Sequence, residues 1–252
     1  MDGKSARATS TRSFAGREGG TTLHSSSRLG ADGDPLMAAF VVRGRSSDPR
    51  VRVLDAMIET VSYRGYDRTT MERVLQSAAV PAAVFEEHFE DKEDCFLQAL
   101  DELVAHIEGE VREALARGAT WPERVRLGLE ALLKALTEDP DGARVILVEC
   151  LSAGAAADER HRALMRGFPP LLEEGRFHSA NPDHLPPGTS EALVGGIVAI
   201  LHRRALEDRT GELPRLLGDL AYFALLPYLG HHRALVAAYA KRPAAAPRRA
   251  AL

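Results

Sequence analysis

The segment TTMERVLQSAAVPAAVFEEHFEDKEDCF, residues 69–96, constrains the fold of this chain more than any other stretch. It contains three helix-start signals: the capping box of Thr69 with Glu72, then Pro81, then Asp91. These signals predict a short helix ending near Ala78, a second short helix ending near Phe89, and the start of a third. Two short helices separated by a tight link are the layout of a helix-turn-helix, here at about residues 71–90.

Helical signals continue on both sides of this segment. Asp48 and Pro49 suit the N-cap and the first position of a helix that Gly65 can end. Beyond the segment, apolar residues recur at helical spacing as far as Gly118, and further apolar helices are predicted up to about residue 240. Since no stretch shows a convincing strand pattern, the sequence predicts an all-α fold.

Composition narrows the class of protein. Hydrophobic residues make up 45% of the chain, the net charge is −4, and two cysteines are too few for a disulfide framework. The longest apolar run, residues 192–201, is far shorter than the roughly 20 residues that span a bilayer, so we expect a cytoplasmic protein without a membrane segment. Gly-rich phosphate loops, nucleophile elbows, HExxH motifs and metal-ligand spacings are missing from the sequence. We therefore predict neither an enzyme nor a cofactor or metal site.

The two ends of the chain differ from its middle. Residues 1–47 are rich in Ser, Thr, Gly and Arg and show no sustained periodicity, which predicts a disordered N-terminal arm. Residues 241–252 predict a second flexible tail, which is basic.

Residues 50–107 resemble the DNA-binding domain of the TetR family of transcriptional regulators. The likeness is carried by an amphipathic first helix ending in GY, by the TT pair that follows, and above all by HFEDKEDCFLQALDE, residues 88–102. The resemblance implies an all-α protein in two parts. An N-terminal three-helix helix-turn-helix domain over residues 48–108 would be followed by a helical ligand-binding and dimerisation domain over residues 109–240.

The resemblance also implies a function and partners. A homodimer, joined through helices at about residues 190–207 and 213–229, is expected to bind a double-stranded DNA operator. A small-molecule effector, whose identity the sequence leaves open, would release the operator, so the implied role is that of a ligand-responsive repressor. Apolar stripes on the two helices suit a dimer seam, with the core of a single chain as the alternative: Leu193, Ile197, Ile200, Leu201, Leu216, Leu220, Phe223 and Leu226.

The expected DNA contacts lie on the first helix and on the helix-turn-helix. The candidates are Arg50, Arg68, Thr69, Thr70, Pro81, Ala82, Ala83, Phe85, His88 and Lys92. Lys92 occupies the position of the family's phosphate-side lysine. For the arginines a solvated surface is the alternative, and for Thr69 a role in capping alone.

The helix that would enter the major groove departs from the family pattern. Where relatives carry serine, polar or basic residues and a tyrosine, this chain has PAAVFEE from residue 81, whose alanines can make only methyl contacts, for example with thymine. Between residues 81 and 94, six acidic residues oppose one lysine. Ala79 also stands where relatives commonly have a turn glycine. A second hypothesis is therefore a TetR-fold protein with a degenerate recognition helix, acting as a heterodimer partner or protein-interaction module.

A ligand pocket would lie among the middle helices. Its candidate lining residues are Trp121, Glu149, Cys150, Met165, Phe168 and Phe177. For each of them, an ordinary place in the core or on the surface is the alternative.

Overall fold

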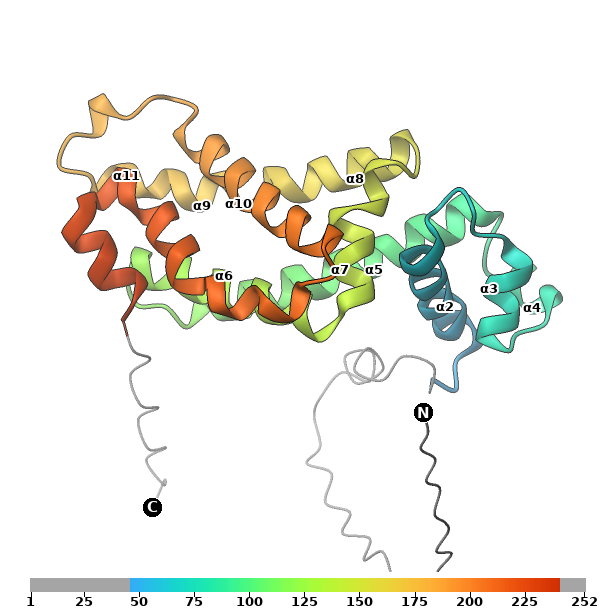
Figure 1. The fold of residues 1–252 in the computed structure, drawn as a ribbon. Helices are drawn as coiled ribbons and strands as arrows, with labels where there is room; N and C mark the ends of the chain where they lie inside the picture. The colour runs from blue at the N-terminus through green and yellow to red at the C-terminus, as the bar shows by residue number, and fades with distance from the viewer. Residues whose placement is uncertain (1–45, 241–252) are drawn as a thin grey trace, which may run out of the picture. The chain divides into compact units, whose positions relative to one another are not determined.

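The computed structural model describes residues 46–240, and all regular structure in that part of the chain is helical (Figure 1). This confirms the all-α prediction. The predicted basic tail and, apart from Ser46 and Ser47, the predicted N-terminal arm lie outside the described residues. In chain order the elements are α2 (Pro49–Arg64), α3 (Met71–Ala78), α4 (Ala82–Glu86), α5 (Lys92–Ala116), α6 (Trp121–Glu138), α7 (Pro140–Leu147), the 3-10 turn η1 (Glu149–Leu151), α8 (Ala155–Arg166), α9 (Pro169–Glu173), η2 (Glu174–His178), η3 (Pro182–His184), α10 (Thr189–Leu206), η4 (Thr210–Leu216) and α11 (Leu217–Ala238).

We call residues 48–108 the head and residues 109–240 the body. In the head, the helix starts at Asp48 and Asp91 form as predicted. Asp48 Oδ1 accepts a hydrogen bond from the Arg50 amide (2.8 Å), and Asp91 Oδ1 accepts one from the Asp94 amide (2.8 Å). Each cap satisfies a backbone N–H that the first helical turn leaves without a partner.

The predicted capping box at Thr69 is wrong. Helix α3 begins at Met71 with Thr70 at its N-cap. Thr69 lies one residue further out, is only 2% exposed, and donates its hydroxyl to the Gly65 carbonyl oxygen (2.9 Å). The hydroxyl therefore closes the link after α2, where Gly65 has a φ of 82° that only glycine adopts readily.

Helix α4 is shorter than predicted. Pro81 is its N-cap residue rather than its first residue, and the helix ends at Glu86 instead of near Phe89. The last turn tightens because the amides of His88 and Phe89 both donate to the Phe85 carbonyl oxygen (2.9 Å each). The side chains of Phe85 and Phe89 are both buried and stack with centroids 5.2 Å apart.

The body is assembled from α6 to α11 around the C-terminal half of α5, with α6 packed against both α5 and α11. Trp121, the first residue of α6, is buried and donates its indole N–H to the Leu171 carbonyl oxygen (2.7 Å). Its ring packs edge-on against Tyr228 of α11, with centroids 5.4 Å apart. This one side chain thereby fixes α6, α9 and α11 together.

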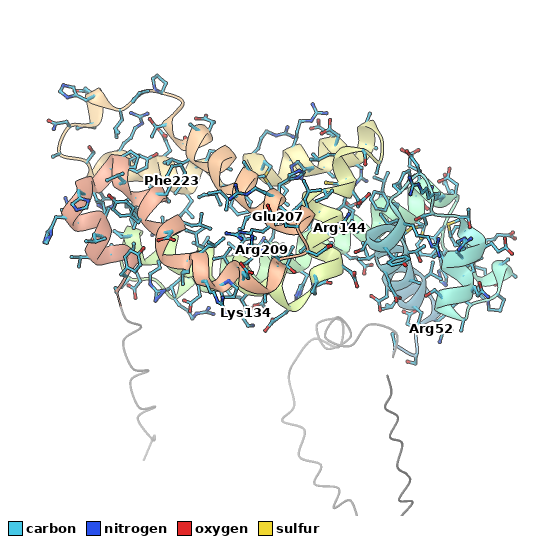
Figure 2. All side chains as sticks on the ribbon, in the orientation of Figure 1. Arg52, Lys134, Arg144, Glu207, Arg209 and Phe223 are labelled. Carbon is cyan, nitrogen blue, oxygen red and sulfur yellow. The ribbon has the colours of Figure 1, made fainter. Side chains whose placement is uncertain are left out.

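The helices predicted to form a dimer seam are present, and the second of them differs from the prediction in extent. The second begins as η4, becomes α-helical at Leu217, and continues to Ala238 with a break at Gly230 (φ 71°, ψ 168°). Four of the predicted seam residues are buried within the single chain: Leu193, Ile197, Leu201 and Leu220. Phe223, which belongs to the same predicted stripe, is 41% exposed (Figure 2), so the stripe on α11 is divided between the core of the chain and its surface.

Ala79 links α3 to α4 in the left-handed conformation, with φ 52° and ψ 47°. For a residue with a Cβ atom this conformation costs roughly 1–2 kcal/mol. The absence of the usual turn glycine is therefore a local strain that the packing of the head overcomes.

We expect the substitution Ala79→Gly to stabilise the chain by about 0.5–1 kcal/mol, because glycine relieves the strain but loses more entropy on folding. Chemical denaturation of the full chain measures this change. The matched control is Ala105→Gly, at an exposed alanine inside α5, which should destabilise the chain by about 1 kcal/mol. Destabilisation by both substitutions would contradict strain at Ala79.

Candidate DNA-binding head and ligand cavity

The N-terminal part of α4 is exposed and carries no polar side chain. Pro81, Ala82 and Ala83 are all exposed, whereas Val84 is half-buried. Phe85 is buried in the core of the head, so it cannot reach a base edge, and the prediction that it contacts DNA is wrong. What this helix can offer DNA is a small apolar surface of one proline ring and two methyl groups.

The acidic residues around α4 have two different roles. Asp91 caps α5, and Asp94 Oδ2 accepts a hydrogen bond from the Glu90 amide (3.0 Å), so these two carboxylates satisfy backbone groups. Glu86 and Glu87 end α4 and are exposed, as is His88. Glu86 and Glu87 lie at the C-terminal end of α4 and cap no helix start, so they leave negative charge beside the exposed alanines.

Arg50 and Arg52, at the start of α2, brace the head. The Arg50 guanidinium donates to Glu102 Oε1 (2.6 Å) and to Gln98 Oε1 (2.9 Å) on α5. Arg52 donates through Nε to the Ala78 carbonyl oxygen at the end of α3 (3.2 Å). Since its charge is already paired with Glu102, Arg50 is a weaker phosphate ligand than the sequence suggests.

Lys92 is also held locally. Its ammonium donates to the Tyr66 carbonyl oxygen (2.6 Å) and lies 4.0 Å from the centroid of the Tyr66 ring. Partial burial lowers the pKa of Lys92, with Asp67 acting in the opposite direction. The ammonium thus fixes the α5 N-terminus against the link after α2, while Arg68 and Thr70 on that link are exposed.

The body contains a cavity of about 70 Å³ among α5 to α11. Every side chain that lines it is apolar: Ile107, Val111, Val125, Leu129, Leu132, Leu136, Ile146, Leu147, Leu164, Met165, Phe168, Leu171, Leu172, Val194, Ile197, Val198, Leu201 and Ala224, together with Gly128. Apolar cavities of this kind stay dry and accept apolar molecules. Two of the six predicted lining residues, Met165 and Phe168, are among them.

The other four predicted lining residues lie elsewhere. Phe177 is 90% exposed, and Trp121 fills the α6–α9 corner instead of facing the cavity. Glu149 pairs with Arg144 (3.5 Å) on the side of α7 that faces the end of α2. Cys150 is buried, donates its thiol to the Ile146 carbonyl oxygen (2.8 Å), and has its pKa raised to about 12 by burial. Choosing lining residues for their aromatic or reactive side chains therefore did not identify the wall of the cavity.

Sequence reasoning missed the contribution of α10 and α6 to the cavity. Ile197 and Leu201 were assigned to a dimer seam, yet they line the cavity together with Val194 and Val198. The available signal was the strong apolar character of α10 on more than one face, which is expected of a helix buried between neighbours.

Helix α7 belongs to both the cavity and the junction with the head. Ile146 and Leu147 line the cavity, while Asp141 accepts a hydrogen bond from the Ser62 hydroxyl of α2 (2.8 Å). Arg144, labelled beside Glu207 in Figure 2, pairs with Glu149 (3.5 Å) and with Asp208 at the end of α10 (3.3 Å).

Two histidines hold the C-terminal end of α7. His161 Nδ1 lies 3.1 Å from the Ile146 carbonyl oxygen, and His202 Nδ1 lies 2.6 Å from the Leu147 carbonyl oxygen. These carbonyls are among the groups that a helix end leaves unpaired. Burial lowers the pKa of His161, so near neutral pH it acts there as a neutral donor.

Among residues 46–240, no helix has the length and apolar character needed to cross a membrane. In the same residues, no three His, Cys, Asp or Glu side chains come together in a way that could hold a metal ion.

Comparisons with known proteins agree with this geometry. Residues 53–99 match the family described as bacterial regulatory proteins, tetR family. The chain is 30% identical over 97 residues to the HTH-type transcriptional activator FasR of Mycolicibacterium smegmatis, a match that covers 38% of this chain and 44% of that protein. The chain thus spans less than half of the length of that relative.

Two solved structures share the fold over most of the chain. The fatty acid degradation regulator FadR from Bacillus halodurans has a TM-score of 0.63 at 16% identity, covering 72% of this chain and 96% of that one. FadR from Bacillus subtilis, solved in complex with stearoyl-CoA, has a TM-score of 0.59 at 18% identity, covering 71% and 98%. Residues 53–99 in the head thus match the tetR family, and the chain shares the fold of these two regulators over most of its length.

Proposed function

We propose that the chain is a homodimeric transcription regulator that binds operator DNA through its head and releases it when an apolar small molecule fills the body cavity. The observation that carries this proposal is the wholly apolar cavity, one wall of which is α7, the helix that is hydrogen-bonded to the head. The match of residues 53–99 to the tetR family supports DNA binding as the output.

The proposed ligand is a fatty acyl group. An unbroken apolar lining offers nothing to a polar molecule, because a buried polar group without a partner costs free energy. The FadR of Bacillus subtilis, which shares the fold, was solved with stearoyl-CoA. A long acyl chain is much larger than about 70 Å³, so binding has to displace wall side chains such as Met165 and Phe168.

That expansion is the proposed origin of the response. A packed wall cannot yield without moving the helices that carry it, and α7 is bonded to α2 through Ser62 and Asp141. The acyl ligand then favours the conformation with the wider cavity. In that conformation the two heads of the dimer are positioned differently, so they no longer fit the operator. The ligand shifts the population only as far as its affinities for the two conformations differ.

On the DNA side, we propose that phosphate contacts come from Arg68, Thr70 and Lys92, and base contacts from Ala82 and Ala83. The two alanine methyls suit the C5-methyl group of thymine in the major groove. Phosphate contacts position the head without reading sequence.

The exposed pair Glu86 and Glu87 favours a second candidate function. Carboxylates beside phosphates weaken any DNA complex, so a head of this kind also suits a TetR-fold protein that binds another protein chain instead of an operator.

Fluorescence anisotropy separates the two candidates. The full chain is titrated against the duplex upstream of its own gene and against a scrambled duplex, over a series of salt concentrations. A preference for the native duplex that stearoyl-CoA abolishes supports the proposed regulator. The same affinity for both duplexes at every salt concentration would rule out operator binding by this chain alone and favour the second candidate.

The double substitution Glu86→Gln and Glu87→Gln should raise the affinity for DNA by about threefold to tenfold at low salt, since it removes two charges that face phosphate. The gain should shrink from about 0.05 M to about 0.3 M salt as screening increases. Glu138→Gln, at the end of α6 in the body, is the control and should change nothing. An unchanged affinity of the double variant would place these glutamates away from DNA.

Ser62→Ala should weaken the link between ligand and DNA without weakening either binding step. Removing this hydrogen bond to a carboxylate should reduce the factor by which stearoyl-CoA lowers DNA affinity by about tenfold. The control is Ser152→Ala, an exposed serine whose hydroxyl donates to Glu149 in its own turn (3.1 Å). A variant that responds to the ligand as fully as the wild type would argue against transmission through this bond.

A further inference from the structure

Tyr228 of α11 carries a buried hydroxyl without a partner. The residue is only 2% exposed, and its hydroxyl oxygen has no hydrogen-bond partner among residues 46–240. Buried polar atoms in folded proteins nearly always have a partner, and an unpaired one calls for a reason such as a missing ligand. The ring itself is well packed, edge-on against Trp121.

The position of Tyr228 is at one end of the apolar cavity. Ala224, one turn earlier on α11, lines the cavity, and so does Leu172 on α9. The residue after Leu172 is Glu173, which instead lines an open surface groove of about 1280 Å³, together with Ser190 at the start of α10. Tyr228 lines neither space itself, but its phenol lies close to Glu173 and Glu191, where α9 and α10 change from cavity wall to groove wall.

The charges around the phenol determine what it can bind. Burial, together with the nearby carboxylates of Glu173 and Glu191, raises the pKa of Tyr228 to about 12, with Arg176 acting in the opposite direction. The hydroxyl thus remains protonated and available as a donor. Glu173 pairs with Arg176, whereas the Ser190 hydroxyl donates to Glu191 Oε2 (3.1 Å). The second carboxylate oxygen of Glu173 is buried and has no hydrogen-bond partner among residues 46–240.

We propose that Tyr228 donates a hydrogen bond to the carbonyl oxygen of a neutral acyl compound, a thioester or ester. The alkyl chain of this compound fills the cavity and its polar remainder leaves through the groove. This inference rests on the proposed function, since it assigns the polar end of the same ligand site. A free fatty acid is disfavoured, because its carboxylate would lie beside Glu173 and Glu191.

The test compares two ligands that differ by one oxygen atom. Stearoyl-CoA and its thioether analogue S-octadecyl-CoA, which lacks the carbonyl, are titrated into the full chain. Fluorescence of Trp121, the single tryptophan, reports binding because its ring packs against Tyr228. The wild type should bind stearoyl-CoA about tenfold more tightly than the thioether, as expected for one well-formed buried hydrogen bond.

Tyr228→Phe keeps the ring and removes only the hydroxyl, so this variant should bind both ligands with the affinity that the wild type has for the thioether. The control is Tyr222→Phe on the same helix. The Tyr222 hydroxyl already bonds His231 (2.9 Å), and this control should keep the tenfold preference. Stearate should bind more weakly than stearoyl-CoA to the wild type.

Four results would overturn the inference. Equal binding of the two ligands by the wild type, or a preference that persists in Tyr228→Phe, would remove the hydrogen bond but leave the acyl ligand of the proposed function intact. Failure of both ligands to bind would remove the acyl ligand as well. A lower melting temperature of ligand-free Tyr228→Phe than of the wild type would show that the hydroxyl already has a partner.

Discussion

The packing of α7 is the constraint on which the rest of the structure depends. This helix of eight residues places Ile146 and Leu147 in the cavity wall and bonds Asp141 to Ser62 of the head. His161 and His202 occupy the carbonyls at its end. With both faces and one end engaged, α7 cannot shift at one contact without altering the others, because a close-packed interior deforms little. A change in cavity volume is therefore also a change at the junction with the head.

The head combines a well-built fold with an unusual reading surface. Its core, its caps at Asp48 and Asp91 and the brace from Arg50 to Glu102 are what a stable three-helix unit needs. Its exposed helix α4 instead presents methyl groups and carboxylates, which on their own bind DNA weakly. In our account, a dimer that doubles the contacts and an arginine-bearing link after α2 compensate for this weakness.

The sequence predicted those structural features that a short stretch of residues determines by itself. The aspartate caps and the positions of Pro49 and Gly65 depend on neighbouring residues alone, and they were predicted correctly. The Thr69 capping box failed because two adjacent threonines compete for the N-cap, and burial of Thr69 against the Gly65 carbonyl decides between them. The cavity could not be derived from the sequence. Its wall consists of side chains from α5 to α11, which lie far apart in the sequence. The apolar periodicity of α10 is the same for a cavity wall as for a dimer seam.

Hydrogen–deuterium exchange of the full chain with and without stearoyl-CoA tests the central claim, that filling the cavity acts on the head through α7. The account predicts slower exchange in the cavity helices and, in the same sample, altered exchange at residues 61–70, where α2 ends and links to α3. Altered exchange confined to the body, or no change anywhere, would contradict it.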